Sequence, residues 1–136
     1  MDFSADETNG QFEGSGSLLR DRWGPALDDG FLLLPTVLLR NQWQLGLDAG
    51  ELVVLENLLV SWREPGRWPV LQALTISKRM GVSLRTVQRQ LVNLEKMGLI
   101  RKTTGASPQG NGDEITAYDL SGTVTALKLI AQSSKE

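Results

Sequence analysis

The 136-residue sequence contains neither cysteine nor histidine. Without cysteine there are no disulfides and no thiolate chemistry. Without histidine, Cys/His zinc sites, Ser–His and Cys–His nucleophile pairs and the commonest general base are also absent. No pair of carboxylates stands out in the pattern of a catalytic cleft. We therefore expect a protein that is not an enzyme and that binds no metal and no cofactor.

Long hydrophobic runs are missing as well. No apolar run approaches the roughly 18 residues of a membrane span, and the first residues lack the basic-then-apolar pattern of a signal peptide. We therefore expect a cytoplasmic protein with no membrane partner. Apolar residues still make up 40% of the chain and include four Trp, which is enough for a core. The length suits one domain with a tail.

Positive charge is not in excess overall, but it is concentrated. The formal net charge is −2. Residues 1–30 hold seven acidic and two basic residues, whereas residues 77–104 hold seven basic residues and one acidic residue. A solvated helical face is one explanation of such a basic cluster, and a nucleic-acid contact is the other. The residues around the cluster decide between these two explanations.

The composition divides the chain into three segments. Residues 1–17 are rich in Gly, Ser, Asp and Glu, which predicts a flexible acidic tail. Residues 18–30 have apolar side chains at near-helical spacing, which predicts an arm that docks on the domain. Residues 31–134 are the predicted folded domain, and its first helix is expected over about 35–45.

A second helix is expected to begin at Asp48, with Glu51 completing a capping box, and to reach Trp62. It is apolar on most sides, which predicts burial by several neighbours. Those neighbours include other helices of the chain or a second subunit. The prolines and glycine of residues 64–69 then interrupt the chain.

Two helices joined by a tight turn follow. The first ends near Met80 at Gly81, which supplies a left-handed backbone, and its start shows no clear cap. Ser83 is expected to cap the second helix, which ends at Gly98. The predicted buried stripe of this second helix comprises Leu84, Val87, Leu91 and Leu94. Strands are expected over 99–104 and 115–120 around a loose tip at 105–113, followed by a helix over 121–132.

The buried stripe determines which residues of the second helix face outward. At 100° per residue, the residues expected near the centre of the opposite face are Arg85, Arg89, Asn93 and Lys96, with Thr86 beside them. Arginine and lysine donate to phosphates or guanine edges, and Asn93 has the groups to pair with adenine. Residues at the N-terminus of such a helix reach base edges. The favoured residues are therefore Ser83, Arg85, Thr86 and Arg89, ahead of Asn93 and Lys96.

Residues 74–102 resemble the winged helix-turn-helix of bacterial transcription regulators and of plasmid replication-initiator N-terminal domains. The resemblance rests on Lys-Arg-Met-Gly-Val-Ser, Arg-Thr-Val-Gln-Arg and Leu-Glu-Lys-Met-Gly-Leu-Ile, and it extends from Gly30-Phe31 to Ser121. It implies a mainly α (α+β) fold: a winged helix-turn-helix with additional N-terminal helices, a two-stranded wing and a C-terminal helix. Ser77 replaces a common Ala, and the wing tip lacks Lys and Arg.

The resemblance and the outward face together predict sequence-specific binding of double-stranded DNA, in transcription regulation or in plasmid or phage replication control. The predicted DNA-binding residues are Lys78, Arg79, Ser83, Arg85, Thr86, Gln88, Arg89, Asn93, Lys96, Arg101 and Lys102. We expect a homodimer, because a two-fold symmetric DNA site offers one half-site to each of two copies. The acidic tail is a candidate surface for a further protein partner.

Two alternatives remain open from the sequence. A winged helix can serve protein contacts alone, without DNA. Separately, Trp43, Trp62 and Trp68 either line a pocket for a small effector or belong to the core.

Overall fold

The computed structural model describes residues 18–106 and 114–134 and divides the chain into two units, Met1–Leu33 and Leu34–Glu136. The described part of the first unit holds a helix over 18–23 and the 3-10 helix η1 (Gly24–Leu27). The predicted acidic tail and most of the predicted wing tip lie outside the described residues. Docking of the arm stays a prediction. Among the described residues, no helix has the length and hydrophobicity to cross a membrane.

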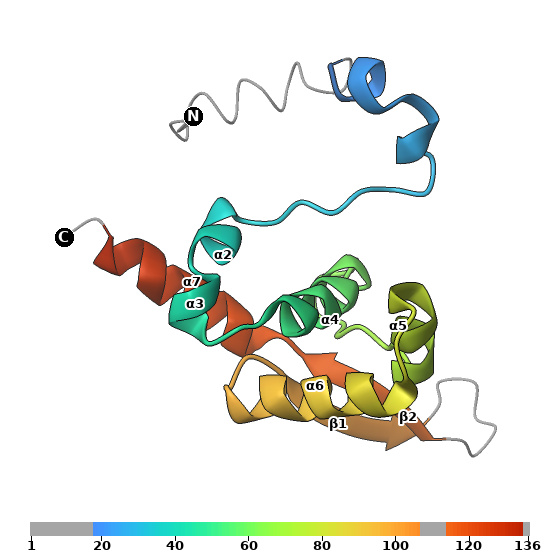
Figure 1. Cartoon of the computed structure of the whole chain (residues 1–136), viewed down its shortest axis with the longest axis vertical. Coiled ribbons are helices and arrows are strands. Elements are labelled where there is room, and N and C mark those ends of the chain that lie inside the picture. Colours follow the sequence, from blue (N-terminus) through green and yellow to red (C-terminus); the bar gives the residue numbers. More distant parts are fainter. Residues whose placement is uncertain (1–17, 107–113, 135–136) are drawn as a thin grey trace. The chain divides into compact units, whose positions relative to one another are not determined.

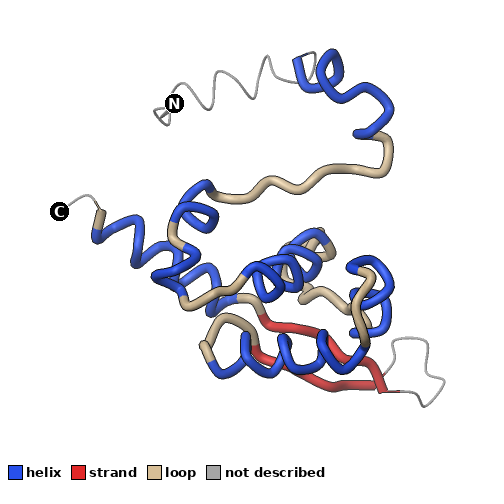
Figure 2. The backbone as a smooth tube through the Cα atoms, in the orientation of Figure 1, coloured by secondary structure: helices blue, strands red, loops and turns tan. Residues whose placement is uncertain are grey.

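The second unit contains eight named helices and strands that enclose one core (Figures 1 and 2). They are, in chain order, α2 (Thr36–Arg40), α3 (Gln42–Leu45), α4 (Ala49–Val60), α5 (Ala73–Met80), α6 (Leu84–Lys96), β1 (Arg101–Ala106), β2 (Glu114–Asp119) and α7 (Ser121–Ser133). Residues buried completely, or almost so, include Leu38, Leu55, Leu58, Ile76, Val87, Leu94 and Leu120.

The single helix predicted over about 35–45 is two short helices, α2 and α3, which meet at Asn41. The side-chain Nδ2 of Asn41 donates to the carbonyl oxygen of Val37 at 2.8 Å, and its backbone leaves the helical region at φ −120°. The Asn41 backbone N–H donates to the same carbonyl oxygen at 3.1 Å, so both bonds close the last turn of α2.

Helix α4 begins with the predicted capping box. The Glu51 backbone N–H donates to Asp48 Oδ1 at 2.7 Å, and the Asp48 N–H donates to Glu51 Oε1 at 3.0 Å. Buried apolar side chains of α4 include Leu52, Val54, Leu55 and Leu58. This helix packs against α6, and its enclosure follows from its wide apolar surface.

Helix α5 begins after Gln72, which makes no side-chain cap, and ends at Gly81 with φ +70°. The left-handed backbone there lets α6 begin three residues later. Ser77 is buried, and its Oγ donates to the carbonyl oxygen of Leu74 at 2.8 Å. A small residue at this place permits the close packing of α5 against α6 (Figure 1).

The strands β1 and β2 pair antiparallel, with Arg101 opposite Asp119 and Lys102 opposite Tyr118. β1 begins two residues later than predicted, because Leu99 and Ile100 are buried core residues that precede the ladder. The sequence also did not indicate that Val70 bridges Ala117 on the other edge of β2.

Helix α7 lies against the chain that leaves α6. The Thr123 hydroxyl donates to the carbonyl oxygen of Leu99 at 2.7 Å, and a Cβ on Gly122 would overlap the carbonyl oxygen of Gly98. Only glycine permits this approach of backbone to backbone. The contact ties α7 to the junction between α6 and the wing.

Candidate nucleic-acid interface

The N-terminus of α6 is capped as predicted. Ser83 Oγ accepts a hydrogen bond from the Thr86 backbone N–H at 3.1 Å, and the two hydroxyls lie 2.9 Å apart. Ser83 is exposed and Thr86 is half-buried. The cap fixes the first turn of the helix and leaves its polar end open to solvent.

Four polar side chains of the predicted set lie on the exposed side of α6: Arg85, Gln88, Arg89 and Lys96. At 100° per residue they fall within one half of the helix surface, opposite the buried residues. Three of the four are cations: Arg85, Arg89 and Lys96. Among the residues that the structure describes, none of the three forms an ion pair. Their charge is therefore available to an external anion.

The buried side of α6 differs from the predicted stripe. Val87, Leu91 and Leu94 are buried as expected, but Leu84 is 38% exposed. Gln90, which is not part of the predicted stripe, is buried at 9% exposed. The stripe is therefore centred between Val87 and Leu94, and it is rotated away from Leu84.

This rotation corrects the expected position of Asn93, which was placed near the centre of the outward face. Asn93 is half-buried, and its Nδ2 donates to Glu51 Oε2 at 2.9 Å. Because Glu51 also caps α4 through Oε1, one buried carboxylate joins the start of α4 to the third turn of α6. Asn93 thus faces α4, which is why we leave it out of the DNA-contacting set.

Gln90 lies at the same contact between α4 and α6. A Cβ on Gly50 would overlap Nε2 of Gln90, so the absence of a side chain at Gly50 makes room for the buried amide. Within the described residues, Oε1 of Gln90 has no hydrogen-bond partner. Sequence reasoning missed this contact, although the glycine in the first turn of α4 was a signal for a close neighbour.

Lys78 and Arg79, the basic residues of α5, are both exposed in its last turn. Arg79 Nη1 donates to Asn57 Oδ1 of α4 at 3.1 Å. This hydrogen bond leaves the charge of Arg79 unneutralised, because its acceptor is a neutral amide.

The two basic residues at the base of the wing have different surroundings. Arg101 Nη2 lies 3.3 Å from Asp119 Oδ2, whereas Lys102 is exposed and forms no ion pair within the described residues. Successive residues of a strand point to opposite faces, so Arg101 and Lys102 do not form one basic surface. A contact of either residue with phosphate stays a prediction.

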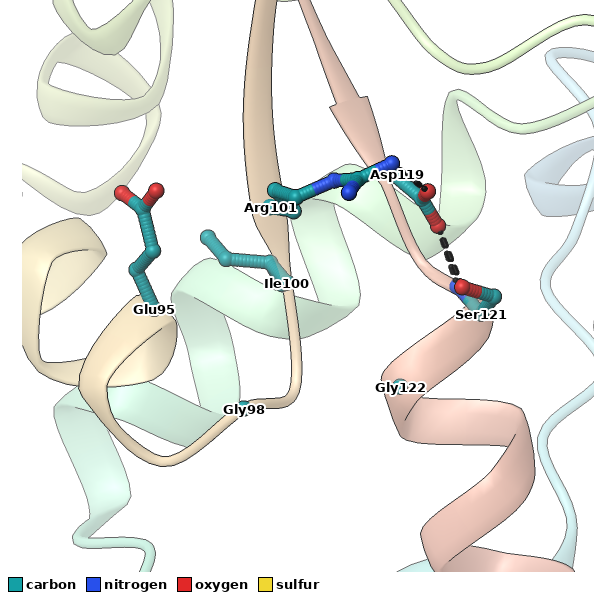
Figure 3. Close-up of a pocket in the computed structure, with 7 residues that line it drawn as sticks. All are labelled: Glu95, Gly98, Ile100, Arg101, Asp119, Ser121 and Gly122. Carbon is teal, nitrogen blue, oxygen red and sulfur yellow. Dashed lines mark hydrogen bonds and ion pairs between the residues drawn. The ribbon is translucent and has the colours of Figure 1, made fainter.

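Asp119 also holds the start of α7 (Figure 3). Its Oδ1 accepts hydrogen bonds from the Ser121 hydroxyl at 2.6 Å and from the Ser121 backbone N–H at 2.8 Å. The Ser121 hydroxyl, then the Ser121 N–H, and to a smaller extent Arg101 hold the pKa of Asp119 below its ordinary value. The pocket beside these residues includes Glu95, Arg101 and Asp119, so its wall is net acidic and does not suit phosphate.

The tryptophans do not gather around one cavity. Trp62 and Trp68 are half-buried, with ring centroids 5.2 Å apart and planes tilted by 41°. Trp43 is 93% exposed. An effector pocket lined by all three is therefore not formed. Among the described residues, no three Asp or Glu side chains gather as a metal site.

The second unit is a winged helix-turn-helix: α5 and α6 form the helix-turn-helix, β1 and β2 the wing, and α4 and α7 support them (Figure 1). This confirms the predicted fold. Residues 64–100 match the family described as "Helix-turn-helix domain". A search of curated proteins finds no match.

Three solved structures are similar to this chain, and the first of them supports the fold. The N-terminal domain of the DnaD protein from Geobacillus kaustophilus HTA426 is 25% identical, with a TM-score of 0.56, over 85% of this chain and 94% of that chain. A possible transcriptional regulator from Methanosarcina mazei Go1 is 22% identical, with a TM-score of 0.47, over 69% of this chain and 75% of that one. A MepR mutant from S. aureus is 16% identical, with a TM-score of 0.47, over 98% and 80%.

Proposed function

We propose that this protein binds double-stranded DNA in a sequence-specific manner through the outward face of α6, as a transcription regulator or a replication-control protein. The observation that carries the proposal is the exposed row Arg85, Arg89 and Lys96, which has no acidic partner among the described residues. The opposite side of the same helix is fixed in the core. A B-form major groove admits an α-helix presented in this way.

The residues of the row have different proposed roles. Arg85 and Arg89 lie in the first half of α6, where side chains of a helix-turn-helix reach base edges. A guanidinium pairs bidentately with the O6 and N7 of guanine. Lys96 lies in the last turn of α6, and it suits a phosphate contact as a flexible point charge.

The proposed active form is a homodimer. One module of this size reads few base pairs, and a two-fold site spaced by one helical turn doubles the contacts. Leu39 and Trp43, which are 62% and 93% exposed, offer apolar surface for such an association. Sedimentation of the Trp43→Ala variant, compared with the parent protein, tests whether that surface is used.

Selection from a random duplex pool tests the proposed function. We expect enrichment of a defined sequence, with log K falling by about 0.9 per phosphate contact as log salt rises. Arg89→Ala should weaken binding to the selected site by about 1–3 kcal/mol. If Arg89→Ala binds the selected site as tightly as the parent protein, the role of Arg89 is refuted.

Two further variants separate base reading from charge. Arg89→Lys keeps the charge but loses the planar fork, so it should lose specificity more than nonspecific affinity. Lys128→Ala removes one exposed charge from α7, and it should change the affinity for the selected site little.

A second candidate function is a protein-interaction module without DNA. The exposed Leu39 and Trp43 favour it, because large apolar side chains at such exposure are typical of interaction surfaces. Failure to retain any duplex at low salt, together with a purified partner whose binding is lost in Trp43→Ala, would support this function over DNA binding.

A further inference from the structure

An apolar residue, Val92, lies among the cations on the outward face of α6. Val92 is 50% exposed. It lies three residues after Arg89, four before Lys96 and seven after Arg85, which is the spacing of neighbours along one helix face. Val92 therefore sits within the charged row, with solvent in front of it.

Folding does not explain valine at this position. A β-branched residue is a weaker helix former than alanine, and most long polar residues are better as well. Half of the Val92 surface remains in water, so its burial contributes little to the stability of the core. A benefit on binding would account for an apolar side chain in the middle of a cationic face.

We propose that Val92 contacts the 5-methyl group of a thymine in the major groove and so selects a T·A pair within the binding site. This inference rests on the proposed DNA binding and adds a base preference to it. The thymine methyl is the apolar group that the major groove presents, and apolar side chains recognise it by contact. Water leaves both surfaces when they meet, which favours thymine over the other bases at that position.

The position of Val92 along α6 predicts where the thymine lies. Seven residues separate Arg85 from Val92, which is about 10 Å along a helix axis. Successive nucleotides of one strand are about 3.4 Å apart along the duplex. If α6 follows the groove, the thymine lies about three base pairs from the base that Arg85 contacts.

Deoxyuridine substitution provides the test, because it removes only the methyl group. After selection of the bound sequence, each thymine is replaced in turn by deoxyuridine, and affinities are measured for the parent protein and for Val92→Ala. One replacement should weaken binding of the parent about fourfold, which is the value of one buried methyl group. The same replacement should leave Val92→Ala unaffected.

Val53→Ala is the matched control. It is the same substitution at a 39%-exposed position on α4, outside the face of α6, and it should retain the sensitivity of the parent to deoxyuridine. Val92→Ala should remain folded, because alanine is the better helix former. A thermal unfolding curve of each variant checks this.

The outcomes separate this inference from the proposed function. A selected site without thymine, or deoxyuridine effects that are equal in the parent and Val92→Ala, would overturn the role of Val92 while leaving DNA binding intact. Failure to retain any duplex at low salt would overturn both. A sensitivity lost in Val92→Ala and kept in Val53→Ala would establish the contact.

Discussion

The two sides of α6 show how one helix serves folding and binding with separate residues. On the inner side, Val87 and Leu94 are completely buried, and Asn93 is hydrogen-bonded to Glu51 of α4. On the outer side, Arg89 is exposed, and Val92 is 50% exposed. Changes on the inner side should therefore alter stability, and changes on the outer side should alter ligand binding at nearly constant stability.

The largest expected effect is that of truncating a core residue. Leu94→Ala should lower the free energy of unfolding by about 2–5 kcal/mol, because the side chain is fully buried and its removal leaves a cavity. Urea denaturation measures the change. Val92→Ala, two residues away on the outer side, should stay within about 0.5 kcal/mol of the parent. Equal losses in the two variants would contradict the division of the helix.

The hydrogen bond between Asn93 and Glu51 comes next. Asn93→Ala removes the donor to Oε2 of a buried carboxylate, so we expect a loss of about 1–3 kcal/mol in the free energy of unfolding. Gln88→Ala removes an amide from the exposed side and should change it by less than about 0.5 kcal/mol. If Asn93→Ala lowers the free energy of unfolding no more than Gln88→Ala, the packing of α4 against α6 does not depend on this hydrogen bond.

The cap of α6 lies where the two sides meet. Ser83→Ala should cost about 1 kcal/mol in the free energy of unfolding, because the Thr86 N–H loses its acceptor. Ser83→Asp restores an acceptor and should recover most of the loss. Thermal unfolding of the three proteins measures the difference, and a failure of aspartate to rescue would argue against capping as the cause.

The smallest effect is expected at the base of the wing, outside α6. The pKa of Asp119 is lowered in the folded state, so its contribution to stability is present above its unfolded value near 3.9 and is lost as pH falls through the folded pKa. Urea midpoints measured between about pH 5 and about pH 2 should fall less steeply for Asp119→Asn than for the parent. Parallel curves would mean that other carboxyl groups account for the acid sensitivity.

Local signals in the sequence predicted most of the helix-turn-helix. Gly81 and Ser83 act within one turn of their own backbone, so the end of α5 and the start of α6 could be derived from residue type alone. The same holds for the capping box at Asp48. The winged helix-turn-helix fold itself was predicted through the motifs of residues 74–102.

Contacts between distant segments could not be derived in this way. The exact rotation of α6 depends on what lies opposite it, and the sequence did not reveal that Glu51 lies within reach of Asn93. The bridge from Val70 to Ala117 is equally non-local. Arg85 and Arg89 were predicted correctly as outward residues, because they lie far from the boundary of the buried stripe.

The close pair of indole rings, Trp62 and Trp68, has a spectroscopic consequence. The two indoles lie 5.2 Å apart across the turn that leads from α4 toward the helix-turn-helix. At this separation their electronic transitions couple, which gives a circular dichroism signal of the pair that neither ring gives alone. Trp43 is 93% exposed, so quenchers dissolved in water reach it readily. The circular dichroism of the Trp62–Trp68 pair therefore reports on the segment between α4 and α5. Quenching of Trp43 fluorescence reports on any partner that covers α3.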